Sequence, residues 1–252
     1  MSAFLRIFRI EALKLRRTLA IWMTVVAPAA VILLQLLIMN RVGGGPGADI
    51  DIWLSFQKNA LTMWALFMQP LFVALVATLV YHLEHASNGW LRLFVLPVPR
   101  WTIPAAKLAA VFGLVTLATV VLFVLDVAAT WMAPALNANV ELPAEIPWGE
   151  LVRRTARVFV ATLAVVAIQN FVSFRFASVP LSLGVGIVGT FVGLFASSWK
   201  GGPYFPWLMG LHAIHGKEAL AARIMWMAPL LAGLVVAATI VYASRRDPAA
   251  GA

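Results

Sequence analysis

Six long apolar stretches constrain this chain more than any other feature of its sequence. A helix that crosses a lipid bilayer needs about 20 largely apolar residues. The stretch at 156–174 is the weakest of the six, because it contains Gln169 and Asn170. We therefore predict one all-α integral membrane domain over residues 1–252. Its expected spans are residues 19–39, 61–81, 104–131, 156–174, 179–197 and 225–243.

The composition also indicates a membrane protein. Of 252 residues, 62% are apolar and 12% are charged, whereas soluble domains are roughly half apolar and about a quarter charged. The net charge of +9 does not indicate a nucleic-acid partner, because the basic residues cluster at the ends of the apolar stretches, where they suit anionic lipid headgroups. Cysteine is absent, which excludes disulfides, thiolate nucleophiles and cysteine metal sites.

The basic residues predict that both termini of the chain lie in the cytoplasm. Five of them precede the first span and only Arg41 follows it closely, and lysine and arginine accumulate on the cytoplasmic side. The first apolar stretch is too long for the core of a signal peptide, so we expect it to remain as a helix. An arginine cluster at 153–157 opposes this orientation. Its expected partners are Glu141, Glu145 and Glu150.

Residues 1–17 form a separate amphipathic segment. One helical face would carry Phe4, Leu5, Phe8, Ala12 and Leu15, and the opposite face Arg6, Arg9, Arg16 and Arg17. An apolar stripe facing a basic one is typical of a helix that lies in the membrane interface. The alternative is a basic flank that only sets the topology.

The connector between the second and third spans, YHLEHASNGWLRLFVLPVPRWTIPAAK, is too apolar for a simple solvated loop. Pro97 and Pro99 end any helix near Leu96, and Pro104 suits the first turn of the third span. We expect a short amphipathic helix, a rigid turn and then the span, so that residues 82–103 form a cytoplasmic surface for a partner. The alternative is an interfacial helix that only anchors the fold.

Two short motifs resemble those of ABC-2 type exporter permeases, in particular the lantibiotic-immunity and bacitracin-export branch. In the connector, Glu84 and Arg92 precede the Pro97–Arg100 turn and Lys107, and the N-terminal segment reads EALKLRRT from Glu11. Six spans in a chain of this length also match that family. The resemblance implies an N-terminal elbow helix, a cytoplasmic coupling helix and an extracellular re-entrant hairpin.

The resemblance further implies the multi-pass permease subunit of an exporter in the bacterial inner (plasma) membrane. Its ATPase would be a separate subunit that binds ATP and Mg²⁺ and docks on the connector and the elbow. A second permease subunit, identical or different, and an amphiphilic cargo such as a peptide, antibiotic or lipid are also implied. The residues assigned to ATPase coupling are Glu11, Arg16, Arg17, Glu84, Trp90, Arg92, Pro97, Arg100 and Lys107.

The chain contains no phosphate-binding loop of its own. The nearest stretch, GLHAIHGKE from Gly210, has one residue too many between its glycines and places Glu218 where a hydroxyl is required. Nucleotide binding is therefore expected on a partner, and no cofactor or catalytic residue is expected in this chain.

Two H-x-x-H pairs, His82/His85 and His212/His215, each place two imidazoles on one helix face. Neither pair has an obvious third ligand, and neither H-E-x-x-H nor G-x-S-x-G is present. An intramembrane enzyme or a metal-handling protein that uses these pairs stays open as the alternative function.

Small residues recur in the fifth span at intervals of four. Gly189, Gly193 and Ser197 form one stripe, and Gly186 lies on a second. This spacing lets two helix backbones approach closely in lipid. The partner helix belongs either to the same subunit or to a second one, and the family resemblance favours a subunit contact near the transport pathway.

Three further features complete the prediction. In the second span, Trp64, Phe67 and Met68 surround Pro70, an expected kink, and either line a cargo path or face lipid. Asp126 is expected near the outer end of the third span, in a structural role. Residues 200–224 resemble the outer hairpin of the same exporters, and the alternative is a surface loop with aromatic anchors.

Overall fold

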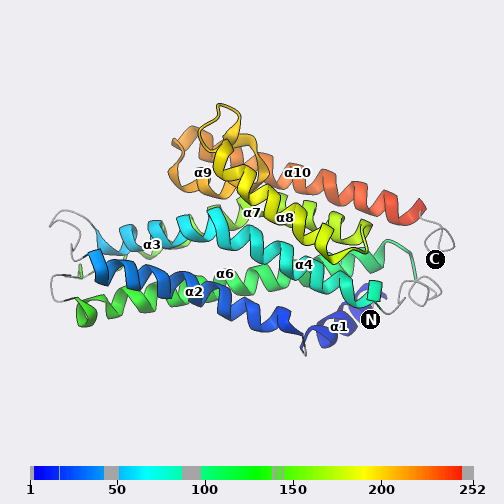
Figure 1. Cartoon of the computed structure of the whole chain (residues 1–252), viewed down its shortest axis with the longest axis horizontal. Coiled ribbons are helices and arrows are strands. Elements are labelled where there is room, and N and C mark those ends of the chain that lie inside the picture. The colour runs from blue at the N-terminus through cyan, green and yellow to red at the C-terminus, as the bar shows by residue number, and fades with distance from the viewer. Residues whose placement is uncertain are drawn as a thin grey trace.

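The elements that the structure describes are helices (Figure 1). The computed structural model describes residues 3–16, 18–42, 51–86, 98–137, 140, 142, 143 and 145–245. Its elements are α1 (Ala3–Leu15), α2 (Leu19–Val42), α3 (Ile52–Met63), η1 (Trp64–Met68), α4 (Gln69–Ala86), α6 (Thr102–Leu136), α7 (Trp148–Arg175), α8 (Val179–Ala196), η2 (Gly202–Tyr204), η3 (Pro206–Leu208), α9 (Met209–His215) and α10 (Glu218–Arg245).

The prediction of an all-helical chain with six spans is confirmed. Six helical stretches of the described chain are long and apolar enough to cross a membrane: α2, the continuous α3–η1–α4, α6, α7, α8 and α10. Each predicted window falls on one of them. Helix α7 begins well before its window, because the arginines at 153–157 pair with acidic side chains and do not interrupt the helix.

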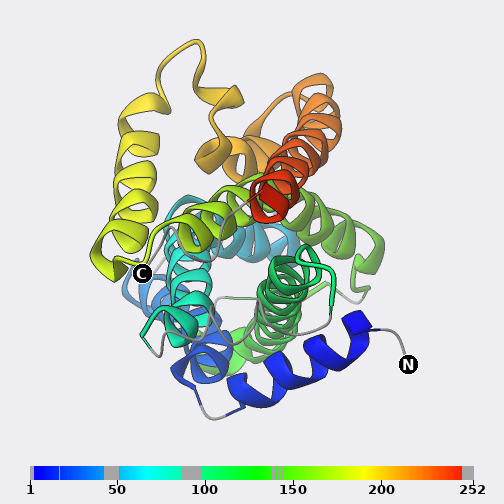
Figure 2. The ribbon, with the colours of Figure 1, turned by 90° about the vertical axis from the view of Figure 1, so that its right-hand side faces the viewer.

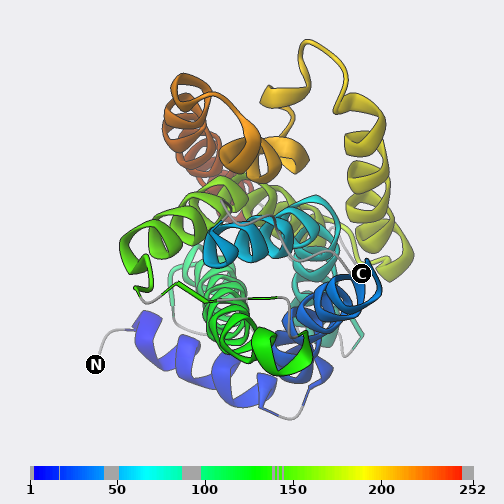
Figure 3. The same cartoon turned by 90° about the vertical axis from the view of Figure 1, so that its left-hand side faces the viewer.

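The spans differ in how far the rest of the chain covers them. Viewed along the long axis, α2, α3–α4, α6 and α7 surround a common centre, whereas α8, α9 and α10 lie on the other side of α7 (Figures 2 and 3). The most apolar window is 61% buried in α3–α4 and in α7, but only 22% in α8 and 17% in α10. Helices α8 and α10 therefore leave most of their surface to lipid or to another protein.

Both termini lie at one end of the bundle (Figure 1). This end, here called the termini end, also carries α1, the turn at 98–101 and the loop at 176–178. The opposite, distal end carries the starts of α3 and α7. An even number of spans requires this arrangement, since each span reverses the direction of the chain.

A π-helical turn interrupts the second span directly before Pro70. The N–H of Gln69 donates to the carbonyl of Trp64, five residues back. Proline has no N–H to donate, and its ring clashes with the carbonyl four residues earlier in a regular helix. The wider turn removes that clash. The irregularity expected at Pro70 thus takes the form of this turn, with Trp64 packed against Phe72 at 6.0 Å between ring centroids.

The small residues of α8 pack against the same chain. A Cβ atom at Gly186 would overlap the Cβ of Ala74 on α4, and a Cβ atom at Gly189 would overlap the indole ring of Trp207. Gly193 is also buried by its own chain. Of the two partners that the spacing allowed, these glycines contact the one within the subunit.

Gly186→Ala and Gly193→Ala form a matched pair for testing this packing. The first substitution forces two backbones apart, and overpacking of this kind costs about 1–3 kcal/mol. The second places its Cβ 3.5 Å from Leu208, an ordinary contact, and alanine favours a helix over glycine by about 1 kcal/mol. Thermal unfolding in detergent should show a loss of stability for Gly186→Ala only. Equal melting temperatures for the two variants would contradict the close α4–α8 approach.

Candidate functional site

Four charged side chains from three helices meet at the termini end. The Lys107 Nζ on α6 lies 2.8 Å from Glu11 Oε2 on α1 and 3.3 Å from Glu84 Oε1 on α4. It also donates to the carbonyl of Val80 at 3.1 Å. The Lys14 Nζ on α1 lies 2.6 Å from Glu84 Oε1 and 3.1 Å from Glu11 Oε1. We call Glu11, Lys14, Glu84 and Lys107 the charge cluster.

The charge cluster is buried and balanced. The side chains of Lys107, Glu11 and Glu84 are 0%, 2% and 7% exposed, and only Lys14, at 34%, reaches the surface. Two ammonium groups face two carboxylates, so the formal charges cancel. The three donors of Lys107 find three acceptors, and its ammonium also lies 5.6 Å from the ring centre of Tyr81. Such full pairing is what makes a charge tolerable away from water.

Lys14 remains protonated at physiological pH. Burial opposes its charge, but hydrogen bonds and attraction from Glu84 and Glu11 outweigh burial and raise the pKa of Lys14 above its ordinary value. A raised lysine pKa stabilises the fold at neutral pH, and that contribution is lost only as the pH rises through the folded-state pKa. Lys14 thus keeps its positive charge throughout the physiological range.

Sequence reasoning singled out three of the four members. Glu11, Glu84 and Lys107 were assigned to coupling as separate residues, and the structure brings them together. Lys14 was missed, although it lies one helical turn after Glu11 and shares its face. Arg16 and Arg100 are exposed at the same end. The predicted residues that lie outside the described ranges are Arg17, Trp90, Arg92 and Pro97.

The cluster ties α1 to the two helices that flank the connector. Helix α4 continues into the start of the connector as far as Ala86, and α6 begins near its end at Thr102. Helix α1 packs along α6 through Ile7 and Ile103. Because the members are buried, a partner cannot contact most of them directly. A displacement of α1 or of either connector end would nevertheless act on the same ion pairs.

A second polar group joins α4, α7 and α8. The Ser182 Oγ on α8 lies 2.7 Å from the Ser173 Oγ and accepts from Thr78 at 3.1 Å, while Gln169 donates to the Ser182 carbonyl at 2.5 Å. The His85 Nε2 lies 3.1 Å from the Ser173 carbonyl. Gln169, one of the two polar residues that weakened the fourth span as a sequence signal, therefore helps to hold α7 against α8.

In the other histidine pair, His215 anchors α9 to the second span. Thr62 donates its hydroxyl proton to the Lys58 carbonyl, so the Thr62 Oγ1 accepts from His215 Nε2–H at 2.7 Å. The His212 Nε2 is buried and has no hydrogen-bond partner within the described residues. Burial lowers the pKa of both imidazoles. The charge of His215 lowers the pKa of His212 further, and the charge of Lys58 lowers the pKa of His215 further. Among the described residues, no three His, Cys, Asp or Glu side chains gather as metal ligands.

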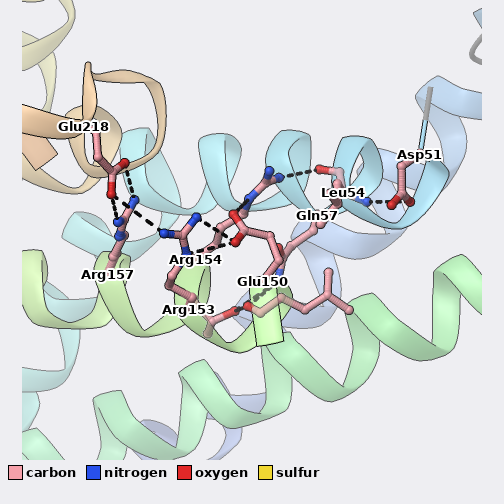
Figure 4. Close-up of polar contacts among 10 residues, drawn as sticks. Asp51, Leu54, Gln57, Glu150, Arg153, Arg154, Arg157 and Glu218 are labelled. Atoms are coloured by element: carbon pink, nitrogen blue, oxygen red, sulfur yellow. Dashed lines mark hydrogen bonds and ion pairs between the residues drawn. The ribbon is translucent and has the colours of Figure 1, made fainter. Parts of the chain in front are cut away.

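Ion pairs at the distal end clasp α7 to its neighbours (Figure 4). Glu150 pairs with Arg153 at 2.7 Å and with Arg154 at 2.9 Å, as expected for Glu150. Arg154 also donates to the Leu54 carbonyl on α3 at 2.9 Å. Arg157 makes a bidentate pair with Glu218 at the start of α10. The sequence alone did not indicate Glu218, and Glu141 lies outside the described residues.

The remaining candidates fall in different surroundings. Trp64 is fully buried, Phe67 is 39% exposed and Met68 is half-buried. Asp126, which is expected near the outer end of the third span, faces the bundle and is 3% exposed. Its Oδ1 has no hydrogen-bond partner in the described part of the chain.

Removal of Lys107 should destabilise the protein strongly. Lys107→Met leaves two buried carboxylates facing only Lys14, and breaking a buried pair on one side costs about 3–5 kcal/mol. Lys107→Met/Glu84→Gln restores the charge balance and should recover part of that loss. Thermal unfolding measures both, with the exposed Lys200→Met as control. If Lys107→Met melts like the control, the cluster does not contribute to stability.

Acidification should weaken the attachment of α9. Because the histidine pKa values are lowered in the folded state, the unfolded state binds more protons as the pH falls through about 6.5, and stability falls with it. Melting temperatures should therefore drop between pH 7.5 and pH 5.5, and less so for His212→Gln/His215→Gln. An unchanged pH dependence in this variant would contradict the assignment.

Comparison with known proteins agrees with these features. A family model described as ABC-2 family transporter protein matches residues 7–193, which include most of α1, the charge cluster and the first four spans. No curated protein and no solved structure matches the chain significantly. The match spans more than half of the chain. The chain therefore belongs to the ABC-2 family of transporter membrane proteins.

Proposed function

We infer that this chain is the permease subunit of an ATP-binding-cassette exporter, of the lantibiotic-immunity or bacitracin-export type. It moves an amphiphilic cargo, such as a peptide, antibiotic or lipid, out of the cell. A separate ATPase subunit binds ATP and Mg²⁺ and drives the movement, and a second permease subunit, identical or different, completes the transporter. Family membership and the absence of a phosphate-binding loop from the sequence support this assignment. Both termini then lie in the cytoplasm.

The charge cluster is the observation that carries the proposal. An ATPase that docks beside α1 and the connector applies force to three helices, and all three share the ion pairs of Lys107. Since removing a partner from a buried pair is costly, the helices move together rather than apart. The cluster thus converts a push on the surface into a common movement of α1, α4 and α6.

The predicted coupling residues then divide by exposure. Arg16 and Arg100, which are exposed, contact the ATPase together with Arg17, Trp90, Arg92 and Pro97. The buried Glu11, Glu84 and Lys107 act behind that surface as positioning residues. Helix α1 serves as the elbow, since it buries Ile7 and Leu15 and exposes Arg6 and Arg9.

The distal features fit an outer exit in this proposal. Residues 202–215 fold back against the span containing α3 and against α7, with Leu208 and Met209 buried, as a plugging hairpin requires. The contact with the second permease then uses the exposed face of α8, which includes Phe191, Phe195 and Ser197. Phe67 and Met68 remain candidates for the cargo pathway.

Arg100→Ala tests the coupling. Because Arg100 is exposed, and exposed charges contribute little to stability, its loss should change the melting temperature little. The loss should abolish ATP-driven export and lower the ATPase activity of the assembled complex. Lys200→Ala is the matched control, because Lys200 follows α8 and is also exposed. This variant should retain both activities. The measurement uses the permease co-purified with its ATPase and reconstituted in proteoliposomes.

Two results would overturn the proposal. One is purification of a transport-competent chain that has no nucleotide-hydrolysing subunit. The other is full export by Arg100→Ala together with full export by a Trp90→Ala/Arg92→Ala variant, since the connector would then take no part in coupling.

A further inference from the structure

Two separate hollows lie along the seam between α6 and α7. The first, of about 380 Å³, is also bordered by α1 and α10. The second, of about 250 Å³, is formed by α6 and α7 alone. The first is lined mainly by Phe4, Ala105, Ala109, Phe112, Ala167 and Ala232. The second is lined mainly by Thr116, Thr119, Phe123, Val152, Ala156 and Phe159.

The two hollows lie at different depths of the membrane. The first takes residues 105–112 of α6 and the second takes residues 116–123. An offset of 11 residues along α6 corresponds to about 16 Å at 1.5 Å per residue. The hydrocarbon core of a bilayer is about 30 Å thick. One hollow therefore falls in the leaflet at the termini end and the other in the distal leaflet.

An aromatic pair separates the hollows. Phe112 lines the first and Phe159 lines the second. Their rings meet edge to face, with centroids 5.5 Å apart and an angle of 61°. Each hollow consequently ends near the middle of the bilayer, where the acyl chains of each leaflet also end.

The walls accept only an apolar occupant. Every residue that lines the first hollow is apolar. The second contains three threonines, but their hydroxyls already donate to helix carbonyls: Thr116 to Phe112, Thr119 to Val115 and Thr155 to Leu151. No lining group therefore requires a hydrogen-bond partner from the occupant.

The position of the two hollows identifies the class of occupant. Both are lined by residues of the membrane-spanning helices α6 and α7, so the surrounding bilayer reaches them from the side. The acyl chain of a phospholipid is the apolar group that the bilayer supplies at this depth.

We propose that the α6–α7 seam binds two phospholipid molecules, one from each leaflet, with an acyl chain of each in a hollow that ends at the Phe112–Phe159 pair. This site is independent of ATP-driven transport. It differs from ordinary lipid contact because the alanines recess the wall between neighbouring helices, so that each chain touches more than one helix.

Photo-crosslinking tests this proposal directly. The probe is phosphatidylglycerol with a diazirine near the end of one acyl chain, incorporated into nanodiscs that hold the full-length protein. Mass spectrometry should place the cross-links on both linings of the seam. Ala109→Trp should remove those at the first hollow only, and Ala156→Trp those at the second only. Val124→Trp, on an exposed ridge of α6, should leave both unchanged.

The same experiment can also contradict the proposed lipid site. Labelling that is spread evenly over the exposed ridges and the seam would overturn the proposed site. Labelling of the first hollow that persists in both Ala109→Trp and Ala232→Trp, which alter opposite walls, would also overturn it. Since the sequence lacks cysteine, Ala109→Cys provides a single thiol. Efficient disulfide formation between two copies through this thiol would show a protein contact in place of lipid. Melting temperatures identify any variant that fails to fold. If Ala109→Trp fails to fold, the cross-links of Ala232→Trp test the first hollow in its place.

Discussion

The buried ammonium of Lys107 is the interaction on which the termini end of this protein depends. A lysine with no exposed surface is stable only if opposite charges and hydrogen-bond acceptors surround it, and these come from α1 and α4. Three helices must therefore hold one arrangement together. The same requirement gives this end of the bundle its suitability for coupling, because a partner that moves one of the helices works against ion pairs shared by all three.

The distal end is held in a different way. There the ion pairs of Arg153, Arg154 and Arg157 are partly or largely exposed, so water and salt screen them more than the buried charge cluster. These contacts fix the position of α7, because they connect it to α3 and α10. The termini end is thus held by buried ion pairs that are costly to break, whereas the ion pairs of the distal end break easily. A transporter that is driven from one side and opens on the other would benefit from this difference.

Between the two ends, close packing replaces charge. Gly186 lets α8 approach α4, and the π turn lets the second span continue past Pro70 without a clash. On the opposite flank, alanines recess the seam between α6 and α7 and leave the two hollows that we propose for acyl chains. Small residues therefore serve both purposes in lipid: they bring helices together where they face a helix, and they create hollows where they face the bilayer.

The sequence by itself determined the six helices and their class. A spanning helix satisfies its own backbone hydrogen bonds, so length and apolar character predict it without knowledge of its neighbours, and the lack of a phosphate-binding loop is equally local. Only the tertiary structure decided that Glu11, Glu84 and Lys107 meet with Lys14, that Glu218 pairs with Arg157, that Gly186 faces its own α4 and that Asp126 is buried. Helical periodicity shows which residues share a face, but the rotation and neighbours of each helix arise from packing among all of them.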